Sequence, residues 1–102
     1  MPMLNDIAQS YAERLKNADR KNRVAVFREI INEINELTYE INGQKIDNGS
    51  KLEIYRIIAF EISEYLKAES AFASGAGTKI LIENANDELM SLVNEIVNKL
   101  NG

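Results

Sequence analysis

The side chains that could carry chemistry in this 102-residue chain are carboxylates, amines, guanidinium groups and hydroxyls, because the chain contains neither histidine nor cysteine. Histidine is the commonest general base and a frequent metal ligand, and cysteine supplies nucleophiles, metal ligands and disulfides. We find no convergent set of Glu, Lys, Arg and Tyr side chains that would replace them. The sequence therefore predicts a protein that binds rather than catalyses, without a cofactor or metal.

Two glycine-containing segments look briefly like ligand loops. Residues 75–79 (GAGTK) lack the G-x-x-x-x-G-K-[ST] order of a phosphate-binding loop, and a predicted helix precedes them where such a loop needs a strand. A calcium loop over residues 44–49, with Gly49 in sixth place, would need ligands from Gln44 and Ile46, which suit calcium poorly. We expect a helix break at the first segment and a plain turn at the second.

Acidic residues raise two further possibilities. A row of glutamates would suit a di-iron bundle, but that site pairs Glu with Glu-x-x-His on facing helices, so we expect a solvated face. Glu69 falls on the apolar side of its predicted helix, where a buried carboxylate would need a partner or a raised pKa. The interpretation we favour is that the helix end splays and water reaches Glu69. The row consists of Glu29, Glu33, Glu36 and Glu40.

A basic cluster surrounds the first predicted joint between helices. Residues 1–23 carry five bases against three acids, whereas residues 24–102 carry seven against thirteen. Such a patch could meet anionic lipid or an acidic partner surface, but we favour a solvated corner. The overall charge of −4 argues against a nucleic-acid partner. The cluster comprises Arg14, Lys16, Arg20, Lys21 and Arg23.

Four amphipathic stretches position these groups, with apolar residues recurring at three- and four-residue steps. The third is apolar over more than half of its circumference, so we place it centrally, packed by at least two others. Ser50 and Glu53 predict a capping box at its start. Its apolar side is predicted to run from Ile54 to Phe72. The predicted helices span residues 2–17, 23–42, 50–73 and 78–100.

The joints between these helices carry turn and capping residues. Asp19 or Asn22 is expected to cap the second helix. Gly43, Gly49 and the pair at 75 and 77 are expected to mark helix ends. The run Ile80–Ile82 is compatible with a strand, but the chain offers no strand to pair with it.

Short connections between four helices favour an all-α, antiparallel up-down-up-down four-helix bundle that forms one domain over residues 1–102. A three-helix core with a loosely attached first helix is the main rival. No apolar run approaches the roughly 18 residues that a membrane span needs. The N-terminus lacks the basic-then-apolar pattern of a secretory signal, so we expect a cytoplasmic protein.

Phe60 is the residue that we single out as a candidate contact. It falls in the middle of the polar side of the third helix, with Arg56 and Ile57 beside it. An exposed aromatic next to an aliphatic side chain is a candidate contact patch. The alternative, which the sequence slightly favours, is that the first helix or Ile46 covers Phe60.

The segment around Phe60 resembles a known family. Residues 54–61 read IYRIIAFE, and bacteriocin immunity proteins of the pediocin-like (enterocin A immunity) group carry a segment close to I-N-R-L-V-N-Y-I on their third helix. Ile54 and Arg56 match that segment, and Ile57, Ile58 and Phe60 are similar to it. The chain length and the amphipathic helix before the segment also look like the family.

The resemblance implies a small cytosolic four-helix bundle that protects its producer cell from a cognate membrane-permeabilising peptide. The implied partners are the mannose-type phosphotransferase permease that serves as the peptide's receptor, the bacteriocin itself, or both, at the inner face of the membrane. It also implies that specificity lies after Ala73. Read from the residues alone, a small helical interaction or regulatory module remains open, such as an antitoxin-like or phage accessory protein. A homo-oligomer that buries Ile57 and Phe60 between copies would belong to that class.

Overall fold

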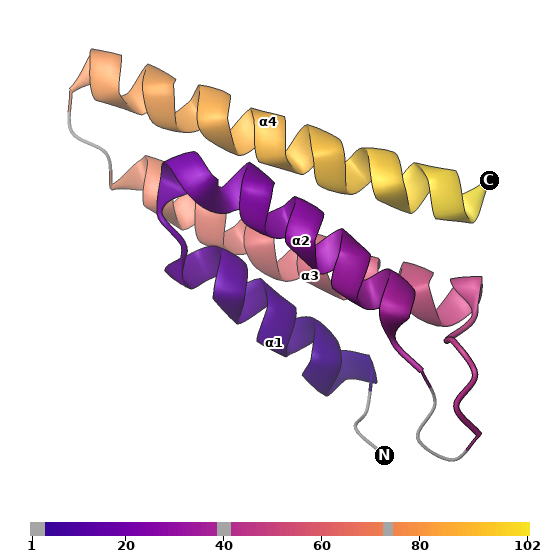
Figure 1. Ribbon diagram of the computed structural model, residues 1–102. Coiled ribbons are helices and arrows are strands. Elements are labelled where there is room, and N and C mark those ends of the chain that lie inside the picture. The colour runs from indigo at the N-terminus through magenta and orange to yellow at the C-terminus, as the bar shows by residue number, and fades with distance from the viewer. Residues whose placement is uncertain (1–3, 39–41, 73–74) are drawn as a thin grey trace.

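The computed structural model describes residues 4–38, 42–72 and 75–102. In these residues the fold is all-α, and the direction of the helices alternates along the chain (Figure 1), which confirms the predicted four-helix bundle. A short 3₁₀ turn, η1, precedes the second helix. The elements are α1 (Leu4–Asn17), η1 (Arg20–Asn22), α2 (Arg23–Glu36), α3 (Asn48–Ala71) and α4 (Ala76–Asn101).

Helix α3 lies between α1 and α4 and packs along both, while α2 contacts α1 and α4. The central position expected for this helix is therefore confirmed. The rival arrangement, in which the first helix attaches loosely, is wrong because α1 is one of the two main neighbours of α3. Ala8 and Ala12 lie one turn apart on α1 and have no exposed surface, so these small side chains let α1 approach its neighbours closely.

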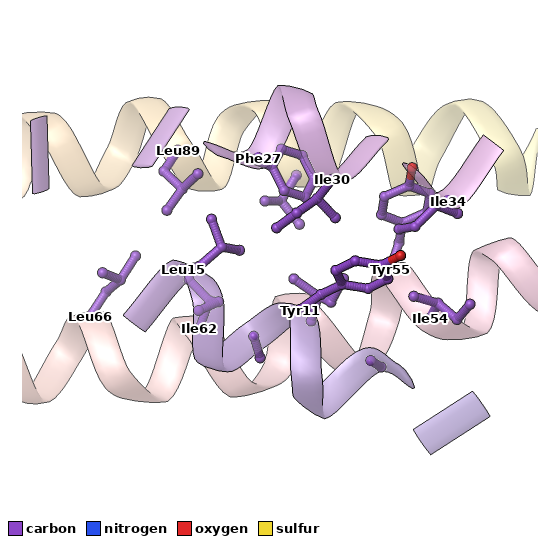
Figure 2. Close-up of a cluster of buried hydrophobic side chains, with 14 of the residues drawn as sticks. Tyr11, Leu15, Phe27, Ile30, Ile34, Ile54, Tyr55, Ile62, Leu66 and Leu89 are labelled. Atoms are coloured by element: carbon purple, nitrogen blue, oxygen red, sulfur yellow. The ribbon is translucent and has the colours of Figure 1, made fainter. Parts of the chain in front are cut away.

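The core receives side chains from all four helices (Figure 2). The rings of Phe27 on α2 and Tyr55 on α3 meet edge to face, with centroids 6.1 Å apart and planes at 73°. Burial raises the pKa of Tyr55 to about 12, so its hydroxyl stays neutral. The side chains without exposed surface include Leu15, Phe27, Ile30, Ile34, Ile54, Ile58 and Val93.

Helix α2 ends at Glu36, so the prediction that it continues to Asn42 is wrong. Leu37 is extended, and its carbonyl accepts a hydrogen bond from the Ile46 N–H at 3.1 Å. This pairing carries Ile46 into the core, where it is 7% exposed. Apolar periodicity could not reveal this gain, because Leu37 fits a helical row equally well. Residues 39–41 lie outside the described part of the chain.

Helix α3 begins at Asn48 and is capped by Asp47, so the capping box predicted at Ser50 and Glu53 is wrong. The Asp47 backbone is extended, and its Oδ1 accepts from the Ser50 N–H at 2.7 Å. A carboxylate at this position also meets the positive end of the helix dipole, which a serine hydroxyl does not exploit. Gly49 therefore lies in the first turn of α3 rather than before it.

At the remaining helix ends, the predicted positions of the capping residues fit better than the predicted capping hydrogen bonds. Asp19 and Asn22 stand at the N-caps of η1 and α2, but neither side chain makes a capping hydrogen bond. Gly75 is the N-cap of α4, in the left-handed region at φ 84°, which confirms the predicted break there. The same prediction is wrong for Gly77, which lies in the first turn of α4. Gly43 also has a positive φ, but it lies in the loop beyond α2 and does not end a helix.

Candidate interaction surfaces

The predicted basic cluster is organised around Arg23, the first residue of α2, which is only 4% exposed. Its guanidinium donates two parallel hydrogen bonds to the Glu69 carboxylate, from Nη1 to Oε1 at 2.9 Å and from Nη2 to Oε2 at 3.1 Å. Its Nε donates to the Leu15 carbonyl at 2.9 Å, and Nη2 also donates to the Lys16 carbonyl at 3.3 Å. Arg23 thus caps the last carbonyls of α1 and joins them to α3.

Glu69 lies inside this network rather than at a splayed helix end, so the interpretation favoured from the sequence is wrong. Its side chain is 16% exposed, and Arg20 adds a third bond from Nε at 3.0 Å. The hydrogen bond from Arg23 is the largest cause that lowers the pKa of Glu69 from its ordinary value. Arg23 also lies over the Tyr65 ring at 5.5 Å, which completes the packing around the guanidinium.

Two other members of the cluster are paired with acids on different helices. Arg14 Nη1 lies 2.8 Å from a Glu33 oxygen, and Lys16 Nζ lies 3.6 Å from a Glu61 oxygen. A hydrogen bond from Gln9, reinforced by Lys16, lowers the pKa of Glu61. The cluster is therefore a set of interhelical ties in which the bases already have partners.

Lys21 is the exception, since it is exposed and makes no ion pair with the described residues. The acidic row of α2 is exposed as expected at Glu29, Glu33 and Glu36, and Glu40 lies outside the described residues. No described group of three or more acidic side chains is arranged to hold a metal ion.

Phe60 is 65% exposed, so the alternative in which α1 or Ile46 covers it is wrong. Ile57, the residue predicted beside it, is half-buried and packs against the core. Arg56 is exposed, and its Nη2 donates to the Asn101 Oδ1 at 3.2 Å, which ties α3 to the end of α4. The structure thus leaves Phe60 open on the polar side of α3, one turn from Arg56.

A second exposed apolar group stands where α3 ends and α4 begins, and the sequence did not single it out. Phe72, Leu81 and Ile80 are 88%, 71% and 57% exposed. Phe72 was expected on the apolar side of its helix, and it lies just beyond the last turn of α3. The run Ile80–Ile82 is helical rather than extended, and only Ile82 turns into the core.

A groove of about 440 Å³ runs between α3 and α4 next to this group. Leu66 and Met90 contribute apolar lining to it. Asn86, which is 8% exposed, also lines the groove and donates from Nδ2 to the Leu66 carbonyl at 3.5 Å. Ser70 at the rim donates to Glu83 at 3.3 Å.

No protein-family model, curated protein or solved structure matches this chain. Among the helices of the described residues, none is long and apolar enough to cross a bilayer. What remains for a functional assignment is the resemblance at residues 54–61 together with the two surfaces where apolar side chains are open, at Phe60 and at the α3–α4 connection.

Proposed function

We propose that this chain is a bacteriocin immunity protein, which protects its producer cell from a cognate membrane-permeabilising peptide by binding rather than by catalysis. The proposal starts from the resemblance of residues 54–61 to the third-helix segment of the pediocin-like group. The observation that carries it further is the 65% exposure of Phe60 inside that segment. An aromatic side chain of this size is costly to leave in water and is a frequent anchor in protein interfaces.

In this proposal Phe60 is the contact residue, Ile57 supports it from the core side, and Arg56 is bonded to Asn101 beside it. The partner is the mannose-type phosphotransferase permease, the bacteriocin, or both, met at the cytoplasmic face of the membrane. Discrimination between peptides would fall to the part of the chain after Ala73, which includes α4.

Expression in the cytoplasm of a sensitive Gram-positive cell tests the proposal. The protein should protect against one pediocin-like peptide and not against unrelated bacteriocins. Phe60→Ser should abolish protection while changing the free energy of unfolding by no more than about 0.5 kcal/mol, as is usual for surface positions. Glu64→Ser is the matched control, because Glu64 lies one turn away with a side chain that is 62% exposed, and it should still protect.

Exchange of residues 74–102 with those of a protein of different specificity should redirect the protection. Failure to protect against every pediocin-like peptide tested would contradict the proposal. If Phe60→Ser instead converts an oligomer to a monomer in sedimentation and protection is never seen, the interaction-module alternative replaces it.

A further inference from the structure

Three of the five large apolar side chains that are exposed in the described residues gather at one end of the bundle. Helices α3 and α4 have 24 and 26 residues, whereas α1 and α2 have 14 each. The longer pair therefore projects beyond the shorter pair, as Figure 1 shows where α4 begins. Phe72, Ile80 and Leu81 lie on this projecting part. Single exposed apolar side chains are ordinary, but a group confined to one end marks a contact surface.

The same end is basic, although the chain as a whole is acidic. We define the turn end as residues 19–23, 67–72 and 75–82, where η1 meets the C-terminus of α3 and the N-terminus of α4. It holds five bases and two acids, which leaves seven bases and fourteen acids elsewhere. The charge of the molecule is therefore divided between a basic end and an acidic remainder.

The bases of the turn end differ in how far they are engaged. Arg23 is buried and committed to Glu69, and Arg20 shares that carboxylate. Lys21 and Lys79 are exposed and form no ion pair with any described residue, and Lys67 is 74% exposed with Glu64 3.9 Å away. Asp19, the N-cap of η1, is exposed, and the exposed acids Glu83 and Asp87 line the α3–α4 groove together with Lys67 and Lys79. Three lysine ammonium groups are thus available to an external negative charge.

We propose that the turn end docks on the surface of an anionic lipid bilayer. Phe72, Ile80 and Leu81 enter the headgroup region, and the lysine stems lie along it with their ammonium groups at the phosphates. The molecule extends 53 Å along its longest axis, so end-on contact holds most of the acidic remainder away from the lipid. A second copy suits this surface poorly, because two basic ends would repel each other.

This inference goes beyond the proposed function and does not rest on it. The set of residues also differs from the basic cluster predicted from sequence, since Arg14 and Lys16 are tied to acids on other helices and are not required. A protein that protects no cell could still bind vesicles, and a protecting protein could fail to bind them, so the two proposals fail separately.

Vesicle flotation at about 0.1 M salt, where surface charge still acts over roughly 10 Å, tests the proposal with the full chain. Vesicles of equal parts phosphatidylglycerol and phosphatidylcholine should carry the protein, and pure phosphatidylcholine should carry far less. Replacing Phe72, Ile80 and Leu81 together by Ser should lower the partition coefficient at least tenfold, since three apolar side chains no longer enter the interface. Lys79→Ala should lower it about fivefold.

Two matched variants control for side effects. Phe60→Ser removes an exposed phenyl ring outside the turn end, and Lys99→Ala removes a lysine from the opposite end of α4; both should bind like the parent. Circular dichroism should show unchanged helicity in every variant.

Absence of binding to the anionic vesicles would overturn the proposal. Equal losses for Lys79→Ala and Lys99→Ala would do so as well, because binding would then follow total charge and not this end. Self-association that the triple Ser variant abolishes, without vesicle binding, would assign the surface to a second copy instead.

Discussion

The ion-pair network of Arg20, Arg23 and Glu69, called the corner below, lies at the same end of the bundle as the exposed group of Phe72, Ile80 and Leu81. The charged Arg23 is buried there, whereas the apolar side chains are exposed. Arg23 is 4% exposed, whereas Phe72 and Leu81 are 88% and 71% exposed. The difference follows from how many elements surround each residue. Arg23 stands where α1, α2 and α3 meet, while Phe72 and Leu81 lie on the part of the α3–α4 pair that projects beyond the shorter helices. Burial is thus set by neighbours as much as by hydropathy.

Arg23→Ala should be the most damaging change, because it removes two of the three bonds to the Glu69 carboxylate, leaving only that from Arg20, and takes the donor from the Leu15 carbonyl. Removing one partner of a buried, hydrogen-bonded pair typically costs about 3–5 kcal/mol. Urea denaturation measures the loss. Arg14→Ala is the control, since its pair with Glu33 is exposed and should be worth no more than about 1 kcal/mol. Similar losses for the two variants would remove the distinction between corner and surface.

Low pH should destabilise the protein by protonating Glu69 and weakening its ion pair with Arg23. Its pKa is lower in the folded protein than its ordinary value of 4.5, so its pairing contributes stability that is fully present above that value. The contribution is lost as the pH falls through the lower folded pKa. Urea midpoints measured from about pH 6 to about pH 2 should therefore fall less in Glu69→Gln than in the parent. Equal acid-dependent losses would mean that the carboxylate is not paired in solution.

Asp47→Ala removes an exposed charged cap at the start of α3, and it can be compared with Arg23, the buried cap at the end of α1. The change removes the acceptor of the Ser50 N–H and should cost about 1 kcal/mol, the usual value for an N-cap. Thermal or urea unfolding measures it. A loss as large as that of Arg23→Ala would show that exposure does not separate the two caps.

Phe72→Ser and Leu81→Ser should have the smallest effect on stability, within about 0.5 kcal/mol, because neither side chain has left water in the folded state. Differential scanning calorimetry provides the measurement. A loss of several kcal/mol in either variant would mean that the side chain is buried in solution, and exposure would then not distinguish it from Arg23.

Periodicity was sufficient to predict the four helices, and it placed α3 at the centre because its apolar side is too wide for one neighbour. It could not predict where α2 ends, because the pairing of Leu37 with Ile46 depends on a contact across a loop. It also misplaced the start of α3, since Ser50 and Asp47 both suit an N-cap and only the geometry of the incoming chain selects Asp47.

The candidate surfaces were less predictable than the helices. The position of Phe60 on the polar side was readable from the sequence, but its exposure depended on where α1 and Ile46 came to lie. Glu69 could be noticed in the sequence, because a carboxylate on the apolar side of a helix needs a partner. That partner is Arg23, which lies 46 residues away in the sequence. The open group at Phe72 and Leu81 lies where the α3–α4 pair extends past the start of α2 (Figure 1), and the lengths of the elements alone do not reveal how their ends align.

Because Arg23 also caps α1, the Arg23–Glu69 ion pair requires the base at position 23 and the acid at position 69. A simple ion pair can be inverted, with acid and base exchanging places at little cost. Here an acid at position 23 would face the carbonyl oxygens of Leu15 and Lys16, which offer it no donor and repel its charge. The double exchange Arg23→Glu with Glu69→Arg therefore cannot restore the hydrogen bonds to the end of α1. Over evolution, the base is expected to stay at position 23 and the acid at position 69.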